Sequence, residues 1–237
     1  MADINSTAAT QQYEEENYEQ KCLCVLVLDT SGSMNASGAI NQLNDGLVAF
    51  KNDTMQDPVT RDRLEVAIVS FNSKVDVVQQ PDILPNIQIP TLQASGQTQL
   101  VAAIEKAQEV VETRKLYYKS QGIPYYRPWI VVMTDGDPYP AGQDVDGIAA
   151  KIKVDAADKK YVFFIIGIGN DVQDSVLTTL ATPEFPAARM DAVKFSEFFT
   201  WLSASASVVV NDAAGSTQTA TPTIDWAQGF VIPTDAD

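Results

Sequence analysis

Five oxygen-bearing side chains follow short apolar runs or precede a helical pattern, in three separate segments of the chain. They are Asp29, Ser31, Ser33, Thr98 and Asp135. Carboxylate and hydroxyl oxygens are hard donors, which suit Mg²⁺, Mn²⁺ or Ca²⁺. The chain has no His and only 2 Cys, so zinc, haem and iron–sulfur chemistry are poorly served. The donor types therefore point to a hard divalent cation.

Two apolar runs would position most of these side chains. Residues 22–28 and 129–133 are short and apolar, and each run leads into a turn that holds a carboxylate and a glycine. Such runs are typical of strands buried inside a parallel sheet. Ligands of these sheets collect beyond the carboxyl ends of the strands. We therefore expect the donors to meet where the strands end.

The same residues resemble a known metal site. Asp-Thr-Ser-Gly-Ser at 29–33, the later Thr98 and Thr-Asp-Gly at 134–136 are together similar to the metal-ion-dependent adhesion site of the von Willebrand factor A (vWA) domain. Residues 126–129 and 195–205 resemble the bacterial tellurium-resistance, TerY-like type of this domain. Gln97 departs from that type, in which many relatives carry a second glycine, so we expect a stiffer loop before the threonine.

The resemblance has implications for fold and function. It implies an α/β fold, a three-layer Rossmann-like doubly wound sheet that is mostly parallel, with one antiparallel edge strand and helices on both faces. The alternation of strand and helix patterns agrees with this fold. The ligand set that it implies is Asp29, Ser31, Ser33, Thr98 and Asp135. A sixth coordination position would be left for an Asp or Glu of a partner protein.

The TerY-like resemblance also implies a setting. It points to a bacterial stress-response or phage-defence system in the cytoplasm, sometimes with a kinase or a phosphatase of the same system as partner. The N-terminus lacks a positive, apolar secretory signal, and no apolar run is long enough to span a bilayer. Both observations favour a cytoplasmic protein without a membrane span.

Two function classes stay open from the residues. The first is a non-enzymatic interaction module, in which the cation bridges to a partner's carboxylate. The alternative is a Mg-dependent haloacid-dehalogenase-like phosphotransferase, because Asp29 ends a strand and Asp135 with Asp137 could hold the metal. Such enzymes resemble Asp-x-Asp at the first site, where the second Asp is a proton donor. Here Ser31 stands in that position and no lysine flanks the motifs, so we expect no catalytic residues.

The net charge restricts the partners. It is −15, from 16 basic and 31 acidic residues. This balance repels nucleic-acid phosphates and anionic membrane surfaces at long range. We therefore expect no nucleic-acid partner, and basic protein patches are favoured for encounter.

Length and composition predict one large domain with two tails. We expect an acidic N-terminal lead-in at 1–20, the vWA domain at 21–210 and a Ser/Thr-rich tail at 211–237. That tail carries an apolar hook, which should fold back on the domain or bind a partner. Its members are Ile224, Trp226, Phe230, Val231 and Ile232.

Periodicity places the remaining elements. Besides the two runs above, it predicts buried strands at 64–71 and 161–168, with an antiparallel edge strand around Val75 and Val77. The predicted helices run from Ile40 to Phe50, from Leu100 to Val111, from 145 to 160, and onward from Ser196. A connector is expected at the proline-rich residues 81–90.

Other residues have structural interpretations. We expect Cys22 and Cys24 to be small core residues on one face of a strand, and Phe198, Phe199, Trp201 and Leu202 to pack on the sheet. Asp137 is interpreted as a turn residue, and Asp144 and Asp146 as helix-start charges. Gly167 and Gly169 do not complete a dinucleotide fingerprint, because Val172 occupies the position of its third glycine.

Overall fold

A computed structural model describes residues 19–36, 38–169, 171–190 and 195–211. In this part of the chain one sheet has the strand order β3-β2-β1-β4-β5-β6. Its strands are β1 Cys22–Asp29, β2 Leu64–Phe71, β3 Val75–Ile83, β4 Trp129–Thr134, β5 Val162–Ile168 and β6 Ala188–Met190. All neighbouring strands are parallel except β3, which is antiparallel to β2 at the edge.

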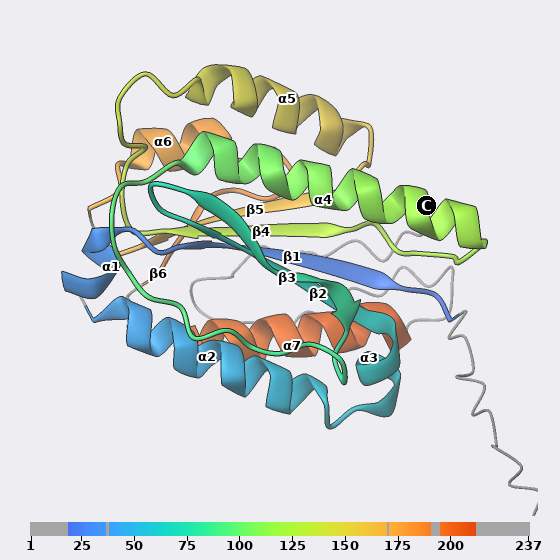
Figure 1. The fold of residues 1–237 in the computed structure, drawn as a ribbon. Helices are drawn as coiled ribbons and strands as arrows, with labels where there is room; N and C mark the ends of the chain where they lie inside the picture. Colours follow the sequence, from blue (N-terminus) through green and yellow to red (C-terminus); the bar gives the residue numbers. More distant parts are fainter. Residues whose placement is uncertain (1–18, 37, 170, 191–194, 212–237) are drawn as a thin grey trace, which may run out of the picture.

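Helices cover both faces of the sheet (Figure 1). They are α1 Gly32–Ala36, α2 Ala39–Thr54, α3 Pro58–Arg63, α4 Leu100–Gln121, α5 Val145–Ala157, α6 Asp174–Leu180 and α7 Phe195–Asn211. Helices α4, α5 and α6 lie on one face, and α2, α3 and α7 lie on the other. The predicted three-layer, Rossmann-like fold with one antiparallel edge strand is confirmed.

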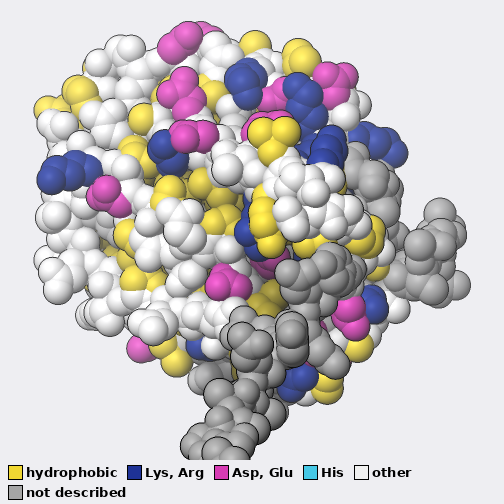
Figure 2. Space-filling view, turned by 45° about the vertical axis from the view of Figure 1, so that its right-hand side comes forward, with side chains coloured by type: hydrophobic (Ala, Val, Ile, Leu, Met, Phe, Trp, Pro, Cys, Tyr) yellow, Lys and Arg dark blue, Asp and Glu magenta, His cyan; other side chains and the backbone are white. Residues whose placement is uncertain are grey.

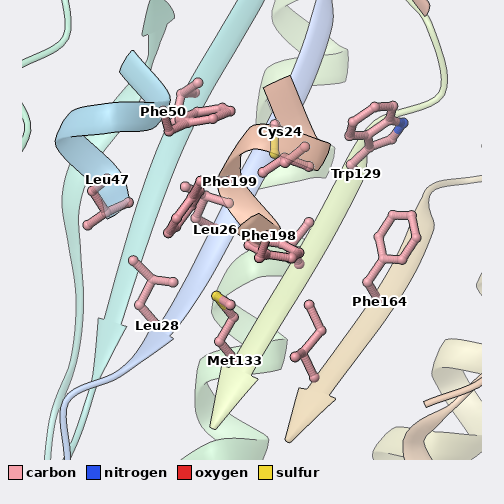
Figure 3. Close-up of a cluster of buried hydrophobic side chains, with 14 of the residues drawn as sticks. Cys24, Leu26, Leu28, Leu47, Phe50, Trp129, Met133, Phe164, Phe198 and Phe199 are labelled. Carbon is pink, nitrogen blue, oxygen red and sulfur yellow. The ribbon is translucent and has the colours of Figure 1, made fainter. Parts of the chain in front are cut away.

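The central strand β1 is apolar from Cys22 to Leu28, before it ends at Asp29, because both of its faces are covered. Leu23, Val25 and Val27 belong to the core beneath α4 and α5. Cys24, Leu26 and Leu28 belong to the core beneath α2 and α7. Figure 3 shows these three side chains along β1, with Phe198 and Phe199 of α7 nearest to Leu26.

The core beneath α2 and α7 confirms two predictions. Cys22 and Cys24 are both buried there as free thiols, and burial raises the pKa of the Cys22 thiol to about 12. The side chains of α7 that were expected to pack on the sheet are all in this core, namely Phe198, Phe199, Trp201 and Leu202. Burying such large apolar side chains contributes roughly 1.5–3 kcal/mol each.

Most predicted elements are present, with shifted ends. The strand at 64–71 is confirmed. The helix predicted at 145–160 ends at Ala157. The prediction of a connector at 81–90 is wrong for its first three residues, because β3 continues through Pro81 to Ile83. Proline is tolerated there because an edge strand has one side on which no backbone N–H is needed.

Parts of the predicted domain plan lie outside the described residues. The structure describes two residues of the predicted lead-in, at 19–20, and Asn211 alone of the predicted tail. The expectation for the apolar hook of that tail therefore stays a prediction. Among the described helices, none combines the length and the apolar composition that crossing a bilayer requires.

Gly46 is predicted to be intolerant of any side chain. A Cβ at this position of α2 would lie 2.6 Å from Cδ2 of Phe199 on α7. Overpacking of this kind costs about 1–3 kcal/mol, so Gly46→Ala should lower the free energy of unfolding by that amount in urea denaturation. Asn41→Ala, an exposed change on the same helix, should shift it by less than about 0.5 kcal/mol. Equal effects of the two changes would contradict the close packing of α2 on α7.

Candidate functional site

The candidate site lies where β1 and β4 end side by side, near α1 in Figure 1. Asp29 is the last residue of β1, and Asp135 directly follows β4. The two strands are in register, with Leu28 opposite Met133. The strands that follow β1 in the sequence, β2 and β3, lie on one side of it, and β4, β5 and β6 lie on the other. The strand order therefore reverses between β1 and β4, which is the topological switch point of the sheet. Ligand sites of doubly wound sheets are found at such a point.

Asp29 is fully buried and tightly held. Its Oδ1 accepts a hydrogen bond from the backbone N–H of Ser31 at 2.7 Å, and its Oδ2 accepts one from the hydroxyl of Thr134 at 2.6 Å. Burial raises the pKa of Asp29 to about 6, although hydrogen bonds from Thr134 and Ser31 oppose this rise. The nearby charge of Asp135 adds to it. The protein thus concentrates negative charge here against a desolvation penalty.

The two serines connect the β1 turn to the end of β4. Ser33 Oγ donates to Asp135 Oδ1 at 2.7 Å, and Ser31 Oγ lies 3.5 Å from the same oxygen. The two serine hydroxyls are 3.0 Å apart. Burial also raises the pKa of Asp135, against the hydrogen bond from Ser33. Residues 102 to 104 positions apart in the sequence therefore share one small polar cluster.

Thr98 approaches the same cluster from the loop before α4. A Cβ built on Gly136 would lie 3.8 Å from Thr98 Oγ1 and 3.8 Å from Ser33 Oγ. Both hydroxyls therefore border the same glycine, directly after Asp135. Thr98 is only 5% exposed. The structure brings all five predicted donors to one end of the sheet.

Backbone hydrogen bonds fix the loop that carries Thr98. Ser95 N–H donates to Thr30 O at 2.8 Å, and Gly32 N–H donates to Gly96 O at 3.2 Å. Gly96 has a φ of 77°, and a Cβ there would lie 2.5 Å from Ser73 Oγ, so a glycine is needed. Gln97, at the position where many TerY-type relatives carry a second glycine, donates its N–H to the same hydroxyl at 3.0 Å.

The neighbouring carboxylates have structural roles. Asp137 accepts hydrogen bonds from the backbone N–H of Gln173 at 2.8 Å and from its side chain at 2.5 Å. Its carboxylate is therefore directed to the start of α6, in agreement with a turn residue. Asp144 caps α5 by accepting from Gly147 N–H at 2.9 Å, and Asp146 lies in the first turn of α5. Both were expected as helix-start charges.

Three supporting residues were missed from the sequence. Thr134 holds Asp29 through its hydroxyl. Tyr139 exchanges two backbone hydrogen bonds with Thr98, both at 2.9 Å, and Gln143 donates its amide to the Thr98 carbonyl at 2.8 Å. Only the place of Thr134, directly before a candidate ligand, was a usable signal. The other two contacts depend on how a long loop folds back.

The chemistry of the cluster fits a hard divalent ion. Two carboxylates and three hydroxyls are oxygen donors of the kind that Mg²⁺ and Ca²⁺ select. Among the described residues, no group of three or more His, Cys, Asp or Glu side chains is arranged to hold a metal ion. Within the same residues, neither Asp29 nor Asp135 has an ion pair to a Lys or Arg. Two desolvated carboxylates without a cation are suited to receive one.

Comparisons with known proteins agree with the fold. The sequence model for the von Willebrand factor type A domain matches residues 24–200. No curated protein matches the sequence. Several solved structures share the fold at low sequence identity, and three of them are informative.

The first is a von Willebrand factor type A protein from Catenulispora acidiphila, with a TM-score of 0.57 and 17% identity over 79% of this chain and 43% of that one. The second is the ArnB paralog VWA2 from Sulfolobus acidocaldarius, with a TM-score of 0.51 and 18% identity over 78% and 45%. The third is proximal thread matrix protein 1 from the mussel byssus with a zinc-occupied MIDAS motif, with a TM-score of 0.51 and 16% identity over 78% and 46%. The chain spans less than half the length of each.

Proposed function

Because the chain belongs to the von Willebrand factor type A domain family, we propose that it is a non-enzymatic, metal-dependent interaction module. A divalent cation would be held by the five donors at the ends of β1 and β4 and would bridge to an Asp or Glu of a partner protein. The donors are Asp29, Ser31, Ser33, Thr98 and Asp135. Members of this family commonly act as metal-dependent interaction modules, and the proposal extends that role to this chain.

One observation supports the proposal most strongly. Asp29 and Asp135 come from adjacent strands, share hydrogen bonds with Ser31 and Ser33, and lie without a cationic partner among the described residues. Placing two carboxylates together in a partly desolvated site costs free energy. A bound divalent cation removes that cost, because it supplies the positive charge that the protein lacks there.

The depth of each donor suggests how the ion would meet a partner. Asp29 is fully buried and both of its oxygens already accept hydrogen bonds, whereas Ser33 is only half-buried. The ion would therefore bind toward the hydroxyls, with Asp29 acting through water. Neutral direct ligands leave the ion with much of its positive charge. Such an ion attracts an external carboxylate into its remaining position.

We propose Mg²⁺ as the resident ion, with Mn²⁺ or Ca²⁺ as alternatives, because the donor set consists of hard oxygens. The mussel matrix protein carries zinc in its MIDAS motif, so a site of this family accepts other divalent ions. Isothermal titration with each chloride salt ranks the ions for this chain.

The alternative of a haloacid-dehalogenase-like phosphotransferase is not favoured. Residues 24–200 match the von Willebrand factor type A domain, which is a different family from the haloacid dehalogenases. Ser31 also occupies the position of the second acidic residue, and its hydroxyl hydrogen-bonds to the Ser33 hydroxyl. The position offers no carboxyl proton for a leaving group.

For the cellular setting we propose a TerY-like, cytoplasmic stress-response or defence system, such as tellurium resistance, with a kinase or phosphatase of that system as partner. Residues 126–129 and 195–205 support this through their sequence resemblance. Nucleic acid is not proposed as a partner because of the net charge of −15. On the face seen in Figure 2, Lys and Arg side chains are interspersed with Asp and Glu rather than gathered into a basic patch.

Substitutions of Thr98 and Asp137 test which residues belong to the proposed ligand shell. Thr98→Ala removes a donor and should weaken Mg²⁺ binding about tenfold, measured by isothermal titration. Asp137→Asn removes a full charge near the site but should change the affinity by less than about threefold, since its carboxylate is directed to Gln173. The reverse order of effects would show that the ligand shell is wrongly assigned.

A pull-down from native lysate tests the proposed function as a whole. The full chain is used as bait with Mg²⁺, with EDTA, and as the Asp29→Asn variant with Mg²⁺, and captured proteins are identified by mass spectrometry. The bridge predicts at least one protein that is captured only by the wild-type chain with Mg²⁺. A partner set that is identical in all three samples would contradict it.

A further inference from the structure

Helix α7 is buried on two opposite flanks. One flank packs against α2, where the ring centroid of Phe199 lies 5.6 Å from that of Phe50. Trp201 lies about 200° further around the helix axis, and its ring centroid is 6.1 Å from that of Phe164 on β5. Ser205 follows one turn later on the same flank and is fully buried. A helix that packs on one side buries a single stripe, so the second flank needs a cover of its own.

No described helix covers this second flank. The described helices on this side of the sheet are α2, α3 and α7 (Figure 1). Helix α3 contacts α7 through Ser207, which lies about 200° around the axis from Ser205, so α2 and α3 are both on the other side of α7. Figure 3 shows Phe164 on the side of α7 that faces away from α2. We call this region the α7–β5 surface, and its members are Trp129, Phe164, Phe185, Trp201 and Ser205.

Two buried polar groups of the α7–β5 surface have no hydrogen-bond partner among the described residues. They are Nε1 of Trp129 and Oγ of Ser205. Buried N–H and O–H groups are seldom left unpaired, because they lose their hydrogen bonds to water without a replacement. A backbone segment that crosses this surface would offer carbonyl oxygens to both groups.

The chain leaves α7 at the end of the sheet where Trp129 lies. The carbonyl of Val210 accepts a hydrogen bond from Arg63 at 2.7 Å, and Arg63 directly precedes β2. Because β2 and β4 are both parallel to β1, Trp129 begins β4 at this same end. The tail that follows Asn211 therefore starts near the α7–β5 surface.

The tail has the length and the composition to cover this surface. Residues 212–223 are rich in Thr and Ala, and a flexible spacer of this length spans about 20 Å. Trp201 lies about 15 Å back along α7 from Asn211, which is within that span. Residues 224–232 then supply the apolar hook and carry no Lys or Arg. A tethered segment has a millimolar effective concentration, which favours it over a second copy of the chain or a separate partner.

We propose that residues 224–232 dock on the α7–β5 surface of the same chain. Trp226 and Phe230 pack against its aromatic side chains, and backbone carbonyls accept hydrogen bonds from Nε1 of Trp129 and Oγ of Ser205. The tail thereby completes the core on the second flank of α7. The hook is used within the chain, which leaves the metal end of the sheet as the surface for a partner. This docking does not involve the metal.

A spin label on the tail tests the docking in the full chain. The two native cysteines are buried, so a nitroxide reagent reacts with the introduced thiol of Ala227→Cys. The chain has 3 Trp, which gives a simple set of indole N–H signals in NMR. With Mg²⁺ or with EDTA, the label should remove most of the intensity of the Trp129 and Trp201 indole signals. The backbone N–H signal of Leu116 on α4, at the other face of the sheet, should keep its intensity.

Two outcomes of this experiment would overturn the inference. Unchanged indole signals of Trp129 and Trp201, also with the label moved to Gln228→Cys, would show that the hook lies elsewhere. The second outcome concerns a mixture of spin-labelled chain with isotope-labelled wild-type chain. Loss of the two indole signals in that mixture would show that the hook docks on a second copy.

Thermal unfolding of the full chain gives an independent readout. Phe230→Ser should lower the melting temperature by about 3–10 °C, because it removes a large apolar side chain from the proposed contact. Ala220→Ser, in the spacer, is the matched control and should change it by less than about 2 °C. Equal melting temperatures of the two variants would overturn the inference, while the metal bridge would stand.

Discussion

Asp29→Asn should reduce the affinity of the chain for Mg²⁺ by about 100-fold. The change keeps the shape of the side chain and an oxygen that accepts from Ser31 N–H, but it removes the charge at the centre of the cluster. The wild-type chain should gain about 2.7 kcal/mol of unfolding free energy at a Mg²⁺ concentration 100 times its dissociation constant. The variant should gain only about 0.4 kcal/mol at that concentration, which equals its own dissociation constant. Thermal unfolding with and without Mg²⁺ measures both.

Asp137→Asn is the matched control for this change. It removes the same charge from a residue only two positions beyond Asp135, and it should retain nearly all of the Mg²⁺-dependent stabilisation. If Asp29→Asn keeps the full stabilisation by Mg²⁺, the ion binds elsewhere and the proposed site is wrong.

Glu65→Ala should lower the free energy of unfolding by about 3–5 kcal/mol. Glu65 is only 3% exposed and forms a paired contact with Arg114, at 2.6 Å to Nε and 2.7 Å to Nη2. It also accepts a hydrogen bond from the Tyr118 hydroxyl at 2.7 Å. Removing the carboxylate would leave a guanidinium and a buried hydroxyl without their partner, at the junction of β2 and α4.

The exposed pair of Lys106 and Glu109 on α4 is the control. Surface ion pairs contribute about 0–1 kcal/mol, so Glu109→Ala should have a small effect. Urea denaturation of both variants gives the comparison. A loss below about 1 kcal/mol for Glu65→Ala would show that the buried network contributes little to stability.

The sequence predicted the fold and the location of the donors because both depend on strong local signals. Buried parallel strands are continuous apolar runs, and such runs allowed β1, β2, β4 and β5 to be predicted. The donors at 29–33 and 135 directly follow two of these strands, so the topology brings them together. The residue pattern marked Thr98 as a hydroxyl before a helical stretch, but only the family resemblance placed it with the other donors, because no periodicity places an irregular loop beside a strand end.

Shorter elements were not predicted for physical reasons. Strand β6 has 3 residues and helix α6 has 7, which is too little for a periodic pattern to stand out. Helix α4 continues to Gln121 and ends where Gly122 adopts a φ of 66°. The buried Tyr118 near its end accounts for the added length, since it packs against Tyr125 and binds Glu65.

The supporting contacts of the site could not be predicted for a similar reason. Thr134 holds Asp29 across two strands, and Tyr139 and Gln143 hold Thr98 across two loops. These contacts depend on three-dimensional closure between segments far apart in the chain. Under the proposed function they would fix the donors before an ion binds, which would lower the ordering cost of binding.

The most direct test of the metal site is a crystal structure of the full chain grown with Mn²⁺, with anomalous data collected at the manganese edge. We expect one strong anomalous peak within about 2.0–2.3 Å of the hydroxyl oxygens of Ser31 and Ser33, bordered by Thr98, Asp29 and Asp135. No peak at this position, with Mn²⁺ present well above the dissociation constant measured in solution, would show that these five residues do not form a metal site.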